Sequence, residues 1–277
     1  MRNTTKGWRP NKPVFPITQE QIDKIENCDI VNPMVGDNHG LKIPEDFDLE
    51  EAAAEVLTTR LRVQKGIFPW DVAEKYWPYK FDMPRYLPKC LEIEGLSFDD
   101  PEGMADIVHM DDPLDFALAL KKALTNPKYG GTANIKGHHN KWKQFIETVI
   151  DVNETITDYQ KRYIRKVFET KYYFGLIRPE EAAPIGPILT AYEEGCPTHP
   201  AIGQGHIALS QASVRALDKE LELKEEQVHD ALYASYLWGF FRVMAGVHYG
   251  IDAIISILAV GGYEKHIKKE VLNAYKI

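Results

Sequence analysis

The amino-acid sequence predicts an all-α protein with an irregular N-terminal arm. Apolar residues recur at helical spacing in several segments, and no segment shows the sustained apolar-polar alternation that marks a strand. The first 50 residues are interrupted by prolines, which disfavour regular structure. These are Pro10, Pro13, Pro16, Pro33 and Pro44. We therefore expect an irregular arm over residues 1–50 and a single helical domain over residues 51–277.

The predicted helices follow one another along this domain. Residues 50–63 begin with an acidic turn and then place Ala52, Val56 and Leu61 at helical spacing. Residues 92–112 are acidic and rich in turn formers, and residues 129–137 are expected to form a loop. Helices are expected at residues 50–63, 70–79, 113–124, 142–151, 155–174, 203–221 and 225–245.

Composition argues against several classes of protein. The 277 residues carry a formal charge of -8, whereas binding to a nucleic-acid backbone needs a basic surface. Cys28, Cys90 and Cys196 are too few and too scattered for a disulfide framework. Residues 1–16 lack the apolar core of a secretion signal, and no apolar stretch approaches the roughly 20 residues that cross a bilayer. A soluble, cytoplasmic protein without membrane contact is therefore expected.

The first candidate site segment runs from Lys171 to Pro179. Lys171 stands near the end of a predicted helix, and Arg178 follows the break at Gly175, so two cations converge on one neighbourhood. Cations are also common at the C-terminal ends of surface helices, because the helix dipole favours them there. Taken alone, this segment is more simply explained as solvated surface.

A glycine-rich turn, Gly203-Gln204-Gly205-His206, forms the second segment. Its glycines let the backbone approach a ligand closely, and the N–H groups at the start of the following helix attract anions. The turn would thus bring His206 and several backbone amides to one anion. An ordinary tight turn with a half-buried histidine explains the same residues equally well.

Arg242, His248 and Asp252 form the third segment. His248 and Asp252 are four residues apart and are expected to share a helix face. A carboxylate that accepts one imidazole N–H fixes the tautomer and leaves the other nitrogen as a nucleophile or ligand. A surface His-Asp pair is the simpler alternative for this segment alone. Together, however, the three segments supply the cations, imidazoles and amides that a tetrahedral oxyanion requires.

These segments resemble the signature motifs of the superfamily that joins vanadium-dependent haloperoxidases to type 2 phosphatidic acid phosphatases and bacterial acid phosphatases. The residues that match the first and third motifs are Lys171, Arg178, Pro179, Arg242, His248 and Asp252. Residues 203–206 stand where the second motif belongs. Residues 194–200, with the sequence EGCPTHP, are similar to the lead-in of algal and cyanobacterial bromoperoxidases. The resemblance covers about residues 170–262.

The resemblance implies a helical bundle of the haloperoxidase and acid phosphatase type, reduced in size, with vanadate as cofactor and phosphate as an alternative occupant. It implies that His248 coordinates vanadium, that His206 is the acid-base partner on the opposite side, and that His199 lies near peroxide and halide. The oxyanion would be held by Lys171, Arg178, Gln204, Gly205 and Arg242. The implied reaction oxidises halide, with bromide the leading candidate, by hydrogen peroxide to hypohalous acid. Small organic substrates and a homo-oligomer are also expected.

Two departures from the family pattern keep other functions open. Gln204 and Phe241 each replace a motif serine, and the chain is shorter than the algal enzymes. One alternative is a soluble phosphatase in which His248 is phosphorylated while His206 protonates the leaving group. Another is a degenerate member that only binds an oxyanion or serves as an assembly subunit.

Other polar residues are not assigned to a site. His109, His138 and His139 lack matching metal ligands and are expected in loops or at the surface. Asp111 and Asp112 are expected to form a solvated turn or a helix cap.

Overall fold

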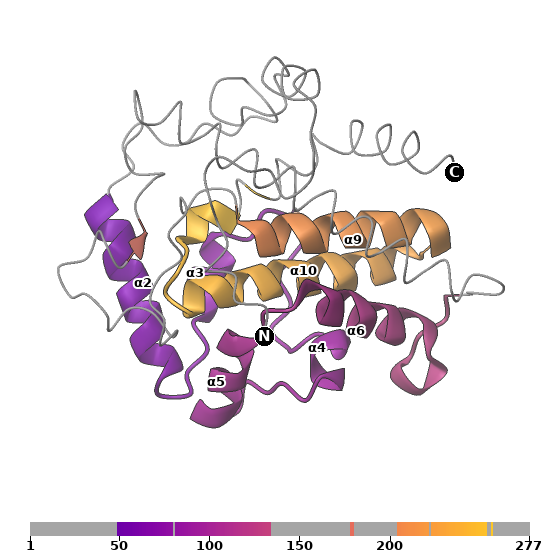
Figure 1. The fold of residues 1–277 in the computed structure, drawn as a ribbon, viewed down its shortest axis with the longest axis horizontal. Coiled ribbons are helices and arrows are strands. Elements are labelled where there is room, and N and C mark those ends of the chain that lie inside the picture. The colour runs from indigo at the N-terminus through magenta and orange to yellow at the C-terminus, as the bar shows by residue number, and fades with distance from the viewer. Residues whose placement is uncertain are drawn as a thin grey trace, which may run out of the picture.

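The computed structural model describes residues 49–79, 81–133, 178–179, 204–221, 223–253 and 256. Within these ranges the chain forms α-helices and one short 3-10 helix, without strands (Figure 1). The all-α prediction is therefore confirmed for the described part of the chain. The predicted arm up to residue 48 and the predicted helices at residues 142–151 and 155–174 lie outside it.

Two helices open the described chain. Helix α2, Leu49–Val63, confirms the prediction for residues 50–63, and it buries Ala53 and Val56. Helix α3, Trp70–Lys75, is shorter than the predicted 70–79. It ends at Tyr76, whose N–H donates to the carbonyl of Glu74.

The prediction of a turn-rich segment at residues 92–112 is wrong for residues 101–109, which form a helix, whereas residues 94–100 contain turns and bends. Helix α4 spans Lys89–Ile93 and helix α5 spans Pro101–His109. The side chain of Asp100 caps α5 by accepting a hydrogen bond of 2.7 Å from the N–H of Gly103. The apolar residues Met104, Ile107 and Val108 are buried. The acidic residues of α5 are exposed, so acidic composition concealed an amphipathic helix.

Helix α6, Pro113–Thr125, begins in the same way as α5. Asp112 caps it by accepting a hydrogen bond of 2.8 Å from the N–H of Leu114, and a proline takes the first helical position. The expected cap at Asp112 is therefore confirmed. The 3-10 helix η2, Pro127–Tyr129, follows and ends at Gly130.

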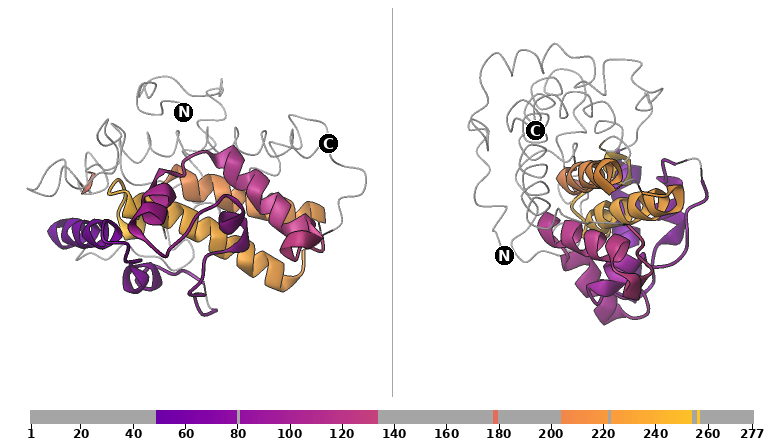
Figure 2. Two further views of the ribbon diagram at one scale, coloured as in Figure 1. Left: turned by 90° about the horizontal axis from the view of Figure 1, so that it is seen from below. Right: turned by 90° about the vertical axis from the view of Figure 1, so that its right-hand side faces the viewer.

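Helices α9, Gly205–Leu221, and α10, Glu225–Met244, form an antiparallel pair (Figures 1 and 2). Gly239 permits their close approach, because a Cβ atom there would lie 1.8 Å from Cγ1 of Ile207. Helices α2 and α5 contact α10, and α6 contacts α9. Residues 233–244 of α10 are all buried, so α10 is the central helix of the described fold.

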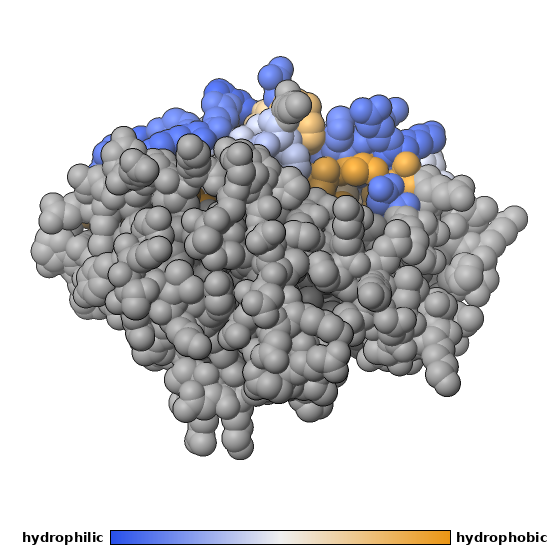
Figure 3. Space-filling model, turned by 90° about the horizontal axis from the view of Figure 1, so that it is seen from above, coloured by the Kyte–Doolittle hydropathy of each residue, from blue (hydrophilic) through white to orange (hydrophobic). Residues whose placement is uncertain are grey.

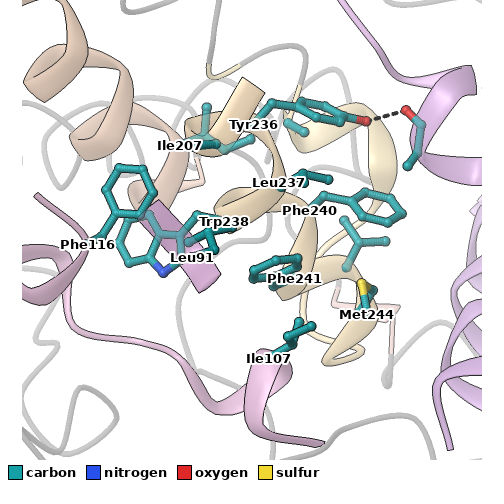
Figure 4. Packing of buried hydrophobic residues seen from close by; sticks show 14 of the residues in the cluster. Leu91, Ile107, Phe116, Ile207, Tyr236, Leu237, Trp238, Phe240, Phe241 and Met244 are labelled. Carbon is teal, nitrogen blue, oxygen red and sulfur yellow. Dashed lines mark hydrogen bonds between the residues drawn. The ribbon is translucent and has the colours of Figure 1, made fainter. Parts of the chain in front are cut away.

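The core is rich in aromatic residues and lies along α10 (Figure 4). The ring of Trp238 stacks on Phe116 of α6 with centroids 4.8 Å apart. The hydroxyl of Tyr236 donates a hydrogen bond of 2.6 Å to the carbonyl of Ala73, which ties α10 to α3. These contacts hold helices from both halves of the chain in one core.

The antiparallel arrangement brings the start of α9 and the end of α10 together. Residues 178–179 lie toward the same end of this helix pair in Figure 1. On the face shown in Figure 3, the described residues form a mostly hydrophilic edge with a smaller hydrophobic area. Among the described helices, none combines the length and apolar character needed to span a membrane.

Candidate functional site

The chain reverses direction at the end of α10 through Gly246. This residue has a φ of 82°, in the left-handed region that favours glycine. Its N–H donates to the carbonyl of Val243, at 2.9 Å, and the N–H of Val247 donates to that of Arg242, at 3.1 Å. This pair of bonds is a common helix ending built on glycine. It returns the chain so that His248 follows directly after the last turn of α10.

His248 and Asp252 pair across the start of the next helix. Nδ1 of His248 lies 3.0 Å from Oδ2 of Asp252, and both side chains are buried. The expectation that they share a helix face is wrong, because helical residues begin only at Gly250. Asp252 also accepts a 3.0 Å hydrogen bond from the N–H of Tyr249, as an acidic residue does in a capping box. One carboxylate therefore caps this helix and orients the imidazole.

Arg178 contacts the other nitrogen of His248. Nη1 of Arg178 lies 3.1 Å from Nε2 of His248 and also donates to the carbonyl of Val247. A guanidinium group only donates hydrogen bonds, so Nε2 is the acceptor and the ring proton lies on Nδ1. Asp252 requires the same tautomer. Two independent neighbours thus place a lone pair on Nε2, directed at a buried cation.

Asp111 joins His206 to Arg242. Its Oδ1 accepts a hydrogen bond of 3.1 Å from Nη1 of Arg242 and also pairs with Nε2 of His206. The expectation of a solvated turn at Asp111 is therefore wrong. Sequence reasoning missed this residue as part of the site.

Arg242 is fixed by further contacts with the end of α5. Its Nη2 donates to the carbonyls of Val108 and Met110, at 2.9 and 2.7 Å. The guanidinium group is buried. Arg242 therefore holds the connection between α5 and α6 against α10, and this contact positions Asp111.

Opposing influences act on the carboxyl of Asp111. Burial favours the neutral form of this carboxyl. The charge and hydrogen bond of His206 favour the ionised form, as do the charges of Arg242 and His109, and together they outweigh burial. The pKa of Asp111 consequently lies well below its usual value. His206 also packs against Trp238, with ring centroids 4.7 Å apart. Asp111 is therefore an anion at neutral pH.

Gln204 immediately precedes α9 and is fully buried. Its side-chain Nε2 donates to the carbonyl of Gly239 on α10, and its backbone N–H donates to Oγ of Ser256, at 2.7 Å. A carbonyl can only accept, which fixes the orientation of the amide. Within the described part of the chain, Oε1 of Gln204 is buried without a hydrogen-bond partner.

The predicted site residues that the structure describes form two groups at one end of the α9-α10 pair. Arg178, His248 and Asp252 form one group, and His206 forms the other with Arg242 and Asp111. Lys171 and His199 lie outside the described residues, as do His138 and His139.

Other predicted residues have separate positions. Gly205 is the first residue of α9, Phe241 is in the core, and His109 is exposed at the end of α5. The described residues contain no group of three or more His, Cys, Asp or Glu side chains that could hold a metal ion.

No protein-family model matches this chain, and neither a curated protein nor a solved structure matches it. Each of the two groups contains a buried guanidinium group, and His248 carries a buried lone pair on Nε2.

Proposed function

We propose that this chain is a vanadate-dependent haloperoxidase whose oxyanion cofactor binds beside His248. The observation that carries the proposal is the fixed tautomer of this histidine. Asp252 holds the proton on Nδ1 and Arg178 contacts Nε2, so the nitrogen that would bind a central atom is the one next to a buried cation. A ligand at Nε2 would take over the contact that Arg178 now makes.

Positive charge and backbone donors would hold the oxygens of the ligand. Arg178 and Arg242 are both buried, where their charge is screened less than at the surface. The first turn of α9, beginning at Gly205, directs N–H groups and the positive end of a helix dipole to the same end of the fold. Lys171 belongs to this set by its place in the motif. When bound, vanadate supplies a Lewis acid that activates hydrogen peroxide toward halide.

His206 and Asp111 would handle the proton. An ionised carboxylate favours the protonated form of an imidazole in contact with it. Asp111 contacts Nε2 of His206 and Nη1 of Arg242. With Nε2 directed at Asp111, Nδ1 of His206 would be the nitrogen that gives a proton to an oxygen of the substrate and recovers it afterwards.

The choice of haloperoxidase chemistry rests on the sequence resemblance over residues 170–262. The helical fold suits a reduced bundle of the haloperoxidase and acid phosphatase type. The described helices that carry site residues, α9 and α10, come from the same part of the chain as the motifs. Homo-oligomeric assembly and small organic substrates belong to the same proposal.

A phosphatase is the second candidate, because the same tautomer would make His248 a nucleophile. Nε2 would attack phosphorus, and His206 would protonate the leaving oxygen. The His248-Asp252 contact suits both chemistries, since each needs the lone pair on Nε2. Products separate them: the phosphatase releases phosphate from an aryl phosphate and carries acid-labile phosphate on His248.

Reconstitution with vanadate tests the leading proposal. The full chain is incubated with vanadate and then supplied with hydrogen peroxide, bromide and a dye that reports halogenation. We expect turnover in the wild type and none in His248→Ala. His229→Ala is the matched control, since His229 is a partly exposed residue of α10 whose ion-pair partner is Glu225.

The outcomes distinguish the candidates. Turnover lost in His248→Ala and kept in His229→Ala supports a haloperoxidase. Phosphate release without halogenation points to the phosphatase. Stabilisation by an oxyanion with neither activity points to a degenerate binding protein, and halogenation that persists in His248→Ala contradicts the proposed site.

A further inference from the structure

A carboxylate lies among the cations of the proposed oxyanion site. Oδ1 of Asp111 contacts both Arg242 and His206, and the side chain is 35% exposed on the solvent side. Any anion that reached Arg242 and His206 would therefore lie next to a negative charge.

The carboxylate of Asp111 affects an anion differently according to whether that anion carries a proton. An oxyanion without a proton presents only acceptors to Asp111 and is repelled. An oxyanion that keeps a hydroxyl can donate an O–H···O hydrogen bond to the carboxylate, and such charge-assisted bonds are short and strong. Asp111 itself resists protonation, because burial is outweighed by His206, Arg242 and His109, which hold its pKa low. The proton must then come with the ligand.

We propose that Asp111 makes this site selective for oxyanions that carry a proton, such as hydrogen phosphate and hydrogen vanadate, over oxyanions that carry none, such as sulfate. The selectivity rests on the proposed oxyanion site. It identifies the class of ligand: a tetrahedral anion with at least one hydroxyl. Size and shape do not distinguish these anions, because phosphate and sulfate are nearly isosteric.

Binding of matched anion pairs to the full wild-type chain tests the proposal. Isothermal titration at neutral pH and constant ionic strength compares phosphate with sulfate, and arsenate with selenate. The two anions of each pair are similar in size, but only phosphate and arsenate carry a proton at neutral pH. We expect the protonated member of each pair to bind at least about tenfold more tightly, a difference of about 1.4 kcal/mol.

Two variants locate the selectivity. In Asp111→Asn the side chain is neutral and its amide can also donate, so we expect sulfate to bind more tightly and the phosphate-to-sulfate ratio to fall about tenfold. Asp112→Asn is the control: it makes the same change of charge one residue away. Asn caps a helix as well as Asp, so α6 should keep its start and the ratio should not change.

The outcomes separate selectivity from the site itself. Equal affinity within both anion pairs in the wild type contradicts the selectivity, while the oxyanion site stands. If the phosphate-to-sulfate affinity ratio changes equally in Asp111→Asn and Asp112→Asn, the effect is a general one of charge, and this result also contradicts the selectivity. Binding of neither phosphate nor sulfate nor vanadate overturns the proposed site and the selectivity together. The wild-type comparison decides the matter even if Asp111→Asn fails to fold.

Discussion

Neighbouring side chains orient the two histidines of the candidate site. Asp252 and Arg178 contact opposite nitrogens of His248, and each requires the same tautomer. Asp111 contacts Nε2 of His206. In the proposed function the two imidazoles have opposite roles, one as an acceptor toward the ligand and the other as a donor of protons.

Replacing Asp252 by Ala should weaken the site and the fold together. The change removes the acceptor of the His248 N–H and the cap of the Tyr249 N–H. We expect a loss of unfolding free energy on the order of 2–4 kcal/mol and at least about tenfold weaker phosphate binding. Urea unfolding and calorimetric titration measure the two effects. Asp106→Asn, an exposed change on α5, should alter neither.

The carboxyl of Asp111 should give a defined pH dependence of stability. Its pKa is lowered in the folded state, so its contribution is complete above the unfolded pKa of about 3.9 and is lost as the pH falls toward the folded value. The stability difference between wild type and Asp111→Asn should shrink as the pH falls below about 4. Urea unfolding at each pH measures it. A difference that grows below about pH 4 contradicts the ion pairs.

Only some of these residues could be found from the sequence. His248 and Asp252 are four residues apart, so their pairing is a local property of the chain. Asp111 is separated by 95 residues from His206 and by 131 from Arg242. Its contacts arise only when α5 and α6 pack against α10, and no local pattern around Asp111 reports that packing.

At the scale of elements, the turn after α10 depends on one glycine. Gly246 has a φ of 82°, and the turn it closes leads directly to His248. Gly130, which ends η2, has the same φ of 82°, and a Cβ atom there would meet nothing within 4 Å. Replacing either glycine by Ala would therefore strain the backbone equally, but only Gly246 is next to the candidate site.

We expect Gly246→Ala and Gly130→Ala to lower the unfolding free energy by a similar amount, about 1–2 kcal/mol each, because Ala is strained in the left-handed region. Only Gly246→Ala should also weaken phosphate binding, since it displaces His248. Chemical unfolding and titration of both variants check this. Equal phosphate affinity in the two variants would mean that the turn does not position the site.

Most described helices could be predicted, and the exceptions have a physical cause. Helices α2, α6, α9 and α10 show long apolar periodicity, which is the strongest local signal. Helix α5 has nine residues and an acidic exposed face, so composition obscured it. The dipeptide Asp100-Pro101 could have indicated the start of this helix, because the same dipeptide, Asp112-Pro113, begins α6.

At the scale of the whole molecule, the antiparallel α9-α10 pair explains why distant segments meet. The start of one helix and the end of the other lie at the same end, and the α5-α6 connection is held there by Arg242 (Figure 1). The two buried arginines at that end lie close to the carboxylates of Asp111 and Asp252 through the contacts of Arg242 and His248.

Oxyanion binding should stabilise the whole fold. A ligand at about 100 times its Kd adds about 2.7 kcal/mol, which for a chain of this size raises Tm by on the order of 5–10 °C. We expect this shift with vanadate or phosphate in the wild type and in His229→Ala, and its loss in His248→Ala. Differential scanning calorimetry at several ligand concentrations measures it. An equal shift in all three proteins would indicate binding elsewhere.

The most direct test is a crystal structure of the full chain with vanadate. The proposed site predicts vanadium bonded to Nε2 of His248, with its oxygens near the guanidinium groups of Arg178 and Arg242 and a hydroxyl toward Asp111. Vanadate bound elsewhere, or Nε2 of His248 still in contact with Arg178 at saturating vanadate, would contradict the proposed function.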